Sequence, residues 1–320
     1  MINKEMLLEK ITPAWMAARM KIAFVALDDI VCEWMMGGLQ QLPHEIVPIW
    51  LNRLSSPDAG LRTAIYEAKP DLIVYGGPAG GPYCPTYNTM SHIREVAPCI
   101  FLCFDASDVG WHAMLAEYRK NQCFDLIVNC DGCDQWPKEG NDITLWCPVG
   151  SSFYAPDTPI LDRSIKFGFC GGHRAPPRLQ IVSYLVGHAN LLVRSRQELY
   201  GTYQGYADFL CQCRIVLNIA YSAGGPHGQD KMTKQFKARC IEVGFAKACL
   251  LETRGSAAAD WLTPGVDYLQ YETPEEATYL VRTASAEYIA ECAENLHKKV
   301  MANHSPQVFW DRVFKRAGIA

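Results

Sequence analysis

A glycine-rich segment followed by basic residues is the part of this sequence that most clearly suggests chemistry. Residues 222–230 contain three glycines and one proline, a composition that predicts a loop. Residues 214–219 before it predict a short buried strand, and residues 231–246 after it predict a helix. A loop that opens a helix beyond a strand presents free N–H groups and the positive end of the helix dipole. The chemistry expected there is the binding of an anion.

Side chains in the same stretch support that expectation. The loop offers small and polar residues for close contact with a ligand, and the helix offers cations in its first half. The loop residues are Gly224, Gly225 and His227, and the cations are Lys231, Lys234, Lys237 and Arg239. The alternatives are a surface loop without a ligand and a solvated basic face.

One carboxylate, Glu242, follows Arg239 by three residues and lies on the same helical face. Residues 239–253, RCIEVGFAKACLLET, resemble the donor-binding helix of group 1 glycosyltransferases of the GT-B fold, in their spore-maturation-protein-like branch. That branch reads roughly Arg-x-Phe-Glu, small residues, a Gly, and an apolar strand that ends near a Thr. Ile241 replaces the Phe, and Lys247 stands where the family usually has a Gly.

The resemblance implies roles in holding a nucleotide-sugar donor. Glu242 would accept hydrogen bonds from two ribose hydroxyls, and the alternative is an ion pair with Arg239. Arg174 would contact the donor phosphates, and Arg178 would either do the same or form a structural ion pair. The broader family often has a second Glu eight positions before the first, where this chain has Lys234. The donor sugar therefore stays open.

The surrounding sequence predicts an α/β protein. Short apolar runs alternate with helical stretches, which is typical of a parallel sheet. The predicted strands are residues 21–27, 45–50, 71–75, 99–104, 124–129, 143–147, 166–170, 190–193, 214–219 and 248–252. The predicted helices after the first domain are residues 177–186, 206–212, 231–246, 273–282, 284–301 and 306–316.

The chain is expected to form two domains. Residues 148–165 contain three prolines and little periodicity, which predicts a linker. The resemblance implies the GT-B fold, two facing Rossmann-like domains with a cleft between them. We expect a Rossmann-like acceptor domain in residues 1–155 and a Rossmann-like nucleotide-sugar donor domain in residues 156–302. The helix in residues 303–320 would pack back on the N-terminal domain.

Three titratable residues past the fourth predicted strand would face this cleft. Asp105 and Asp108 are candidates to orient an acceptor hydroxyl or accept its proton. His112 is a third candidate, because imidazole titrates near neutrality, and its alternative is a structural role at a helix start. Asp28 and Asp29 are weaker candidates, with helix capping as their alternative.

Composition narrows the possible functions. A net charge of −4 and a pI near 6.1 argue against a general nucleic-acid binder, although a nucleic acid is not excluded as the acceptor. No apolar run approaches the ~20 residues that a membrane span needs. The 14 cysteines are expected to be reduced, in a cytoplasmic protein. Cys130 and Cys133 have metal-ligand spacing without a second pair, so neither a metal nor another cofactor is expected.

The leading hypothesis is a glycosyltransferase that moves a sugar from a nucleotide-diphosphate sugar to an unknown acceptor. By its resemblance, it would retain the anomeric configuration and need no metal. The alternatives are a non-catalytic nucleotide-sugar-binding protein and a nucleotide-sugar epimerase on the same fold. The sequence leaves open the donor nucleotide, the acceptor and the oligomeric state.

Overall fold

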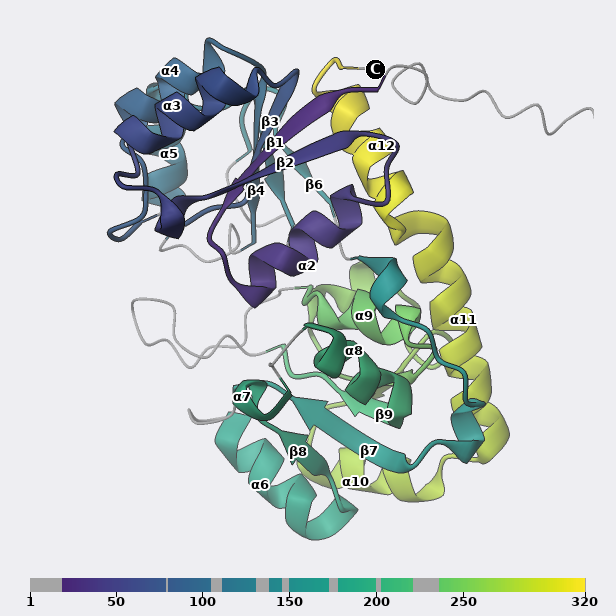
Figure 1. Ribbon diagram of the computed structural model, residues 1–320. Helices are drawn as coiled ribbons and strands as arrows, with labels where there is room; N and C mark the ends of the chain where they lie inside the picture. The colour runs from purple at the N-terminus through teal and green to yellow at the C-terminus, as the bar shows by residue number, and fades with distance from the viewer. Residues whose placement is uncertain are drawn as a thin grey trace, which may run out of the picture.

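A computed structural model of the chain describes residues 19–78, 80–104, 111–130, 138–145, 150–172, 178–199, 203–220 and 236–319. Figure 1 shows two α/β units, one above the other. Each is built on one parallel sheet with helices on both faces.

The first sheet has six parallel strands in the order β2-β1-β3-β4-β5-β6. Its strands are β1 (Lys21–Ala26), β2 (Glu45–Trp50), β3 (Leu72–Tyr75), β4 (Cys99–Cys103), β5 (Leu126–Asn129) and β6 (Ile143–Thr144). The chain moves outward from β1 in one direction and from β3 in the other. Open α/β sheets bind ligands beyond the carboxyl ends of their strands, at such a switch point.

Helices cover both faces of this sheet. On one face lie α3 (Ala59–Ala68), α4 (Tyr87–Arg94) and α5 (His112–Lys120), and on the other lies α2 (Ile30–Leu39). The sequence did not predict α4, whose eight residues are mostly polar. Its start is set by Thr86, whose hydroxyl accepts a hydrogen bond from the Thr89 amide at 3.3 Å.

The second sheet repeats the same winding with five parallel strands in the order β8-β7-β9-β10-β11. Its strands are β7 (Ile165–Cys170), β8 (Leu192–Arg194), β9 (Cys213–Leu217), β10 (Cys249–Thr253) and β11 (Leu269–Tyr271). The switch point of this sheet lies between β7 and β9.

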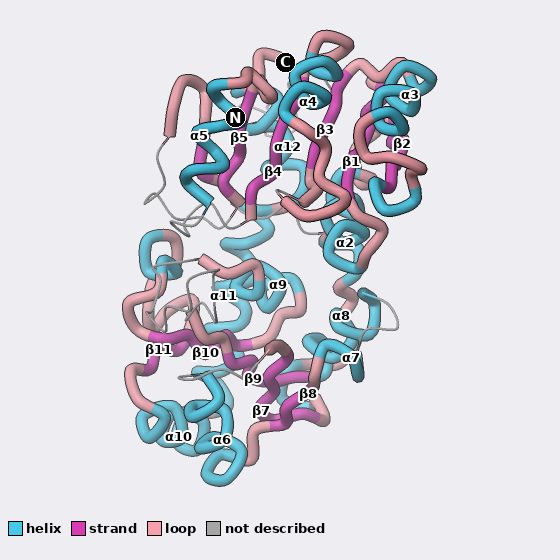
Figure 2. Tube along the Cα trace, turned by 90° about the vertical axis from the view of Figure 1, so that its left-hand side faces the viewer, coloured by secondary structure: helices cyan, strands magenta, loops and turns pink. Residues whose placement is uncertain are grey.

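Helices also cover both faces of the second sheet. The helices are α6 (Arg178–Ala189), α7 (Arg196–Leu199), α8 (Tyr203–Gln212), α9 (Arg239–Phe245), α10 (Pro274–Thr283) and α11 (Ala286–His304). Helices α6 and α10 pack on one face, and α8 and α9 pack on the other. Figure 2 shows α2 and α9 on the sides of the two units that face each other.

The last helix, α12 (Pro306–Arg316), leaves the second unit and contacts the first. Ser305 follows α11 and caps α12, because its hydroxyl accepts from the Val308 amide at 3.4 Å. The Phe314 ring meets the His44 ring with centroids 5.9 Å apart. Arg316 Nε donates to the Asn141 carbonyl at 2.7 Å. The domain limits at residues 155 and 302 stay predictions.

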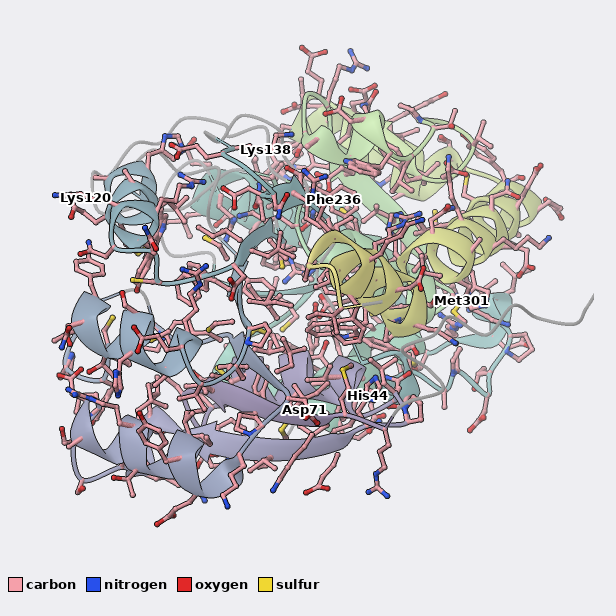
Figure 3. The ribbon with its side chains drawn as sticks, turned by 90° about the horizontal axis from the view of Figure 1, so that it is seen from above. His44, Asp71, Lys120, Lys138, Phe236 and Met301 are labelled. Atoms are coloured by element: carbon pink, nitrogen blue, oxygen red, sulfur yellow. The ribbon has the colours of Figure 1, made fainter. Side chains whose placement is uncertain are left out.

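The predicted α/β fold with two Rossmann-like sheets is confirmed, but one predicted helix is wrong at its start. Residues 231–246 were expected to be helical, whereas Phe236 and Lys237 are not and α9 begins at Arg239. Phe236, labelled in Figure 3, is 2% exposed. Its burial holds the chain in an irregular path before the helix can begin.

Within the part of the chain that the structure describes, no helix is long and apolar enough to cross a membrane.

Candidate functional site

Two arginines meet at the switch point of the second sheet. Arg178, the first residue of α6, donates from Nη1 to the Gly172 carbonyl at 2.9 Å and from Nη2 to the Ile219 carbonyl at 3.4 Å. Gly172 follows β7 and Ile219 follows β9, so this guanidinium bridges the two strand ends between which the winding reverses.

Arg239 enters the same place from the first turn of α9. Its Nη1 donates to Asn218 Oδ1 at 3.5 Å, and its Nε donates to the Tyr206 hydroxyl at 3.3 Å. Its guanidinium carbon lies 5.2 Å from the centre of the Phe169 ring, in cation–π distance. A Cβ on Gly171 would stand 3.1 Å from Nη2, so only a glycine fits there easily.

The two guanidinium groups interact electrostatically. The pKa of Arg178 is lowered to about 10, first by burial and then by the charge of Arg239. Burial acts to lower the pKa of Arg239, but Tyr206, Cys170 and Glu242 outweigh burial and raise that pKa above the usual arginine value. Two cations held this close repel each other, and a bound anion would relieve that repulsion.

A buried carboxylate, that of Glu252, contacts Arg239 indirectly through Asn218. Glu252 is 1% exposed and accepts from Asn218 Nδ2 at 2.5 Å and from the Thr253 amide and hydroxyl, each at 2.8 Å. Burial raises the pKa of Glu252. Because Asn218 also accepts from Arg239, the carboxylate orients the amide that in turn orients the guanidinium.

Sequence reasoning did not single out this support. Asn218 follows β9, and Glu252 and Thr253 close β10, so all three stand where apolar strands end. Polar residues at the carboxyl ends of buried parallel strands are the signal that would have found them.

Glu242 is held by two tyrosines. Its carboxylate oxygens accept from the Tyr203 hydroxyl at 2.6 Å and from the Tyr206 hydroxyl at 2.7 Å, and the side chain is 5% exposed. Tyr206 also accepts from Arg239, so it stands between the two residues and no direct ion pair forms in this part of the chain. A carboxylate has about four acceptor sites, and contact with a donor ribose stays a prediction.

Several residues predicted for the site lie outside the described residues. They are Asp105, Asp108, Arg174, Gly224, Gly225, His227 and Lys234. Lys237 is described and lies partly exposed two residues before α9. The structure therefore brings together Arg178, Arg239 and Glu242 from the sequence-based set.

The corresponding edge of the first sheet is different. His112 is the first residue of α5. Asp28 forms an ion pair with Arg53, and Asp29 caps α2 by accepting from the Cys32 amide at 2.9 Å. The capping alternative for Asp29 is thus confirmed.

Metal ligands are not grouped in the described ranges, where no cluster of three or more His, Cys, Asp or Glu side chains could hold an ion. Cys130 is buried, and Cys133 lies outside those ranges.

Comparison with known proteins agrees with this geometry. Residues 175–314, most of the second unit with α12, match the family model described as glycosyl transferase-like. No curated protein matches the chain.

Solved structures match nearly the whole chain at low identity. HepE of Anabaena, in complex with UDP and glucose, is 10% identical over 94% of this chain and 100% of its own, with a TM-score of 0.63. An alpha-glucosyltransferase in complex with UDP-glucose and DNA containing an abasic site is 8% identical over 94% and 100%, also at 0.63. Sucrose-phosphate synthase of Thermosynechococcus elongatus is 10% identical over 93% and 99%, at 0.60.

The two sheets and the matching structures define the fold of the chain. That fold is GT-B, as the sequence predicted. Over residues 175–314 the chain is similar to proteins described as glycosyl transferase-like. Its place in the spore-maturation-protein-like branch stays a prediction.

Proposed function

We propose that this chain transfers a sugar from a nucleotide-diphosphate sugar to an acceptor held by the first domain, with retention of configuration and without a metal. The observation that carries the proposal is the meeting of Arg178 and Arg239 between the ends of β7 and β9. Negative charge grows on the diphosphate as its bond to the sugar breaks, and two fixed guanidinium groups stabilise that charge.

The same pair supports the proposal that no metal is needed. The two arginines supply the positive charge at the leaving group that a divalent cation supplies elsewhere. Treatment with a chelator should therefore leave the turnover rate unchanged. A loss of turnover that magnesium or manganese restores would contradict this part of the proposal.

Retention is compatible with this site if the acceptor attacks from the face that the diphosphate leaves. The departing phosphate oxygen then takes the acceptor proton, and no strong enzymatic base is required. This is an extension of the family resemblance and is tested by the anomeric configuration of the product.

Donor binding is the first measurement. HepE was solved with UDP and with UDP-glucose, so UDP leads a panel that also contains GDP, ADP, CMP and dTDP. A nucleotide at about 100 times its dissociation constant should stabilise the fold by about 2.7 kcal/mol in a thermal melt. Arg239→Ala should abolish the shift. Arg254→Ala is the matched control, because Arg254 pairs with Glu272 and Glu276 on an exposed surface.

Turnover separates this proposal from its alternatives. A glycosyltransferase should release nucleoside diphosphate slowly when water accepts the sugar and faster when an acceptor takes the sugar. Formation of an epimeric nucleotide sugar without an acceptor would indicate an epimerase, and donor binding with no turnover against a broad acceptor set would indicate a binding protein. Either result would overturn the proposal. A nucleic acid stays among the acceptors to test, and a cytoplasmic location stays a prediction.

A further inference from the structure

A small cavity opens at the carboxyl edge of the first sheet. Its volume is about 130 Å³, and it lies where β3 and β4 end. Its described lining residues are Gly76, Gly77, Pro78, Phe101, Leu102, Cys103, Phe104 and Trp111. The cavity is separate from the arginine site, which belongs to the second sheet.

The lining is apolar. The last three residues of β4 are Phe101, Leu102 and Cys103. Each is at most 4% exposed, so they form the buried side of the cavity. Phe104 and Trp111 are partly buried and supply the aromatic side chains of the cavity. None of the described lining residues carries a charge.

The cavity has the size of one six-membered ring. An engineered cavity of about 150 Å³ lined by Leu, Ile and Phe binds benzene. A sugar ring would fit by volume, but among the described lining side chains only the Trp111 indole N–H and the weak Cys103 thiol could pair with its hydroxyls. An aromatic ring has no such groups and can meet Phe104 or Trp111 edge to face.

The position of the cavity connects it with the reaction. Gly76 and Gly77 follow β3, one of the two strands at the switch point of the first sheet. Trp111 directly precedes His112, the candidate group at the start of α5. A ring in the cavity would therefore leave its substituent at the edge of the sheet from which α5 begins.

We propose that this cavity binds an apolar six-membered ring of the acceptor, which makes the acceptor an aryl-bearing alcohol or glycoside. The inference rests on the proposed function. In the transfer, the acceptor hydroxyl oxygen forms a bond to the anomeric carbon, and the bond from that carbon to the diphosphate oxygen breaks. The hydroxyl proton goes to the leaving phosphate oxygen, and the nucleoside diphosphate is released.

The test compares two acceptors that differ only in the ring. Phenyl β-glucoside and methyl β-glucoside are assayed with the nucleotide sugar that the enzyme hydrolyses. The phenyl compound should show a KM at least tenfold lower and should raise the melting temperature of the donor-free protein more. Equal KM values and equal melting shifts in an enzyme that hydrolyses its donor would overturn the inference and leave the proposed function standing.

Variants of the lining residues test whether a preference for the phenyl compound arises in the cavity. Trp111→Ala and Phe104→Ala should raise the KM of the phenyl compound to that of the methyl compound, and Trp111→Phe should give an intermediate value if Trp111→Ala fails to fold. Tyr279→Ala is the control, because Tyr279 is 65% exposed on α10. Nucleotide-dependent stabilisation reports whether each variant is folded. A phenyl preference that survives in both folded alanine variants would place the ring elsewhere and overturn the inference.

Discussion

The two sheets of this protein wind in the same way, but the side chains at their carboxyl edges differ in charge and polarity. In each, the chain reverses between its first and third strands, β1 and β3 or β7 and β9. The second switch point carries Arg178 and Arg239. Next to the first switch point, at the ends of β3 and β4, lies the cavity lined by Phe104 and Trp111, and Asp28 after β1 forms an ion pair with Arg53.

This difference shows what the fold supplies and what the side chains add. Parallel strands and the helices after them offer the same backbone amides at both edges. At the second edge, Gly171 lets a guanidinium approach the strand end and Glu252 orients that guanidinium through Asn218, as the proposed anion site requires. At the first edge, the cavity lined by Phe104 and Trp111 is the proposed site of an uncharged ring.

Removing Arg239 should have the largest effect of the changes proposed for the two edges. Arg239→Ala takes away one cation of the proposed donor site, and turnover should fall by about 100- to 1,000-fold, as when one preorganised donor to a developing anion is lost. Steady-state donor hydrolysis measures the effect. Arg239→Lys should recover part of the rate, because it keeps the charge but loses the forked geometry.

The opposite result would mean that the donor binds elsewhere. If Arg239→Ala keeps both nucleotide stabilisation and turnover, the second switch point is structural. The donor would then have to bind without the residues that give the two sheets their contrast.

The sequence predicted most of this fold because the fold depends on local patterns. Buried parallel strands such as β3 and β4 are continuous apolar runs, and Ser305 followed by Pro306 marks a helix start. The true start of α9 was missed, because the burial of Phe236 is a tertiary effect that helix propensity does not contain.

The site was less predictable than the fold. Arg239 and Glu242 were identified from their spacing, but the two tyrosines that hold Glu242 come from α8, about 40 residues earlier. Glu252 stands at the carboxyl end of a buried strand, but its contact with Asn218 depends on the pairing of β9 with β10, which residue spacing does not reveal. Contacts between distant segments are what spacing cannot supply.

Acid should destabilise the fold where α11 passes into α12, the helix that contacts the first unit. His304 ends α11, is 3% exposed, and has a pKa lowered to about 3, first by burial and then by Arg312 and Lys299. Below pH 6.5 the unfolded chain binds a proton here that the folded chain does not bind until near pH 3. The free energy of unfolding should therefore fall as pH drops through this window, by about 2 kcal/mol from this residue between pH 7 and pH 5.

Urea unfolding at several pH values measures that contribution. His304→Gln should flatten the pH dependence in this window, because the amide does not titrate. His188→Gln, which changes an exposed histidine on α6, is the control. An unchanged slope in His304→Gln would mean that other groups cause the acid sensitivity.

A single methyl group should weaken the second edge without removing a charge. Gly171 has a φ of 151°, and a Cβ there would meet Arg239 Nη2 at 3.1 Å. Gly171→Ala should shift the guanidinium and weaken donor binding by about tenfold, or about 1.4 kcal/mol, measured by nucleotide titration. Gly187→Ala, on α6 with open space around it, should leave the affinity unchanged. Normal affinity in Gly171→Ala would show that the guanidinium does not need its present position.

The smallest effect should come from a feature that the two domains share. Lys247 after α9 and Lys69 after α3 are exposed and adopt left-handed backbones, with φ of 49° and 48°. Glycine adopts this conformation without strain but loses more entropy on folding, so Lys247→Gly and Lys69→Gly should each stabilise the fold by about 0.5 kcal/mol in urea unfolding. Because both lysines lie in turns away from the carboxyl strand ends, neither change should alter nucleotide affinity. If Lys247→Gly alone weakened nucleotide binding, the lysine in that turn would act on the donor site, and the cationic character of the second domain would extend beyond its switch point.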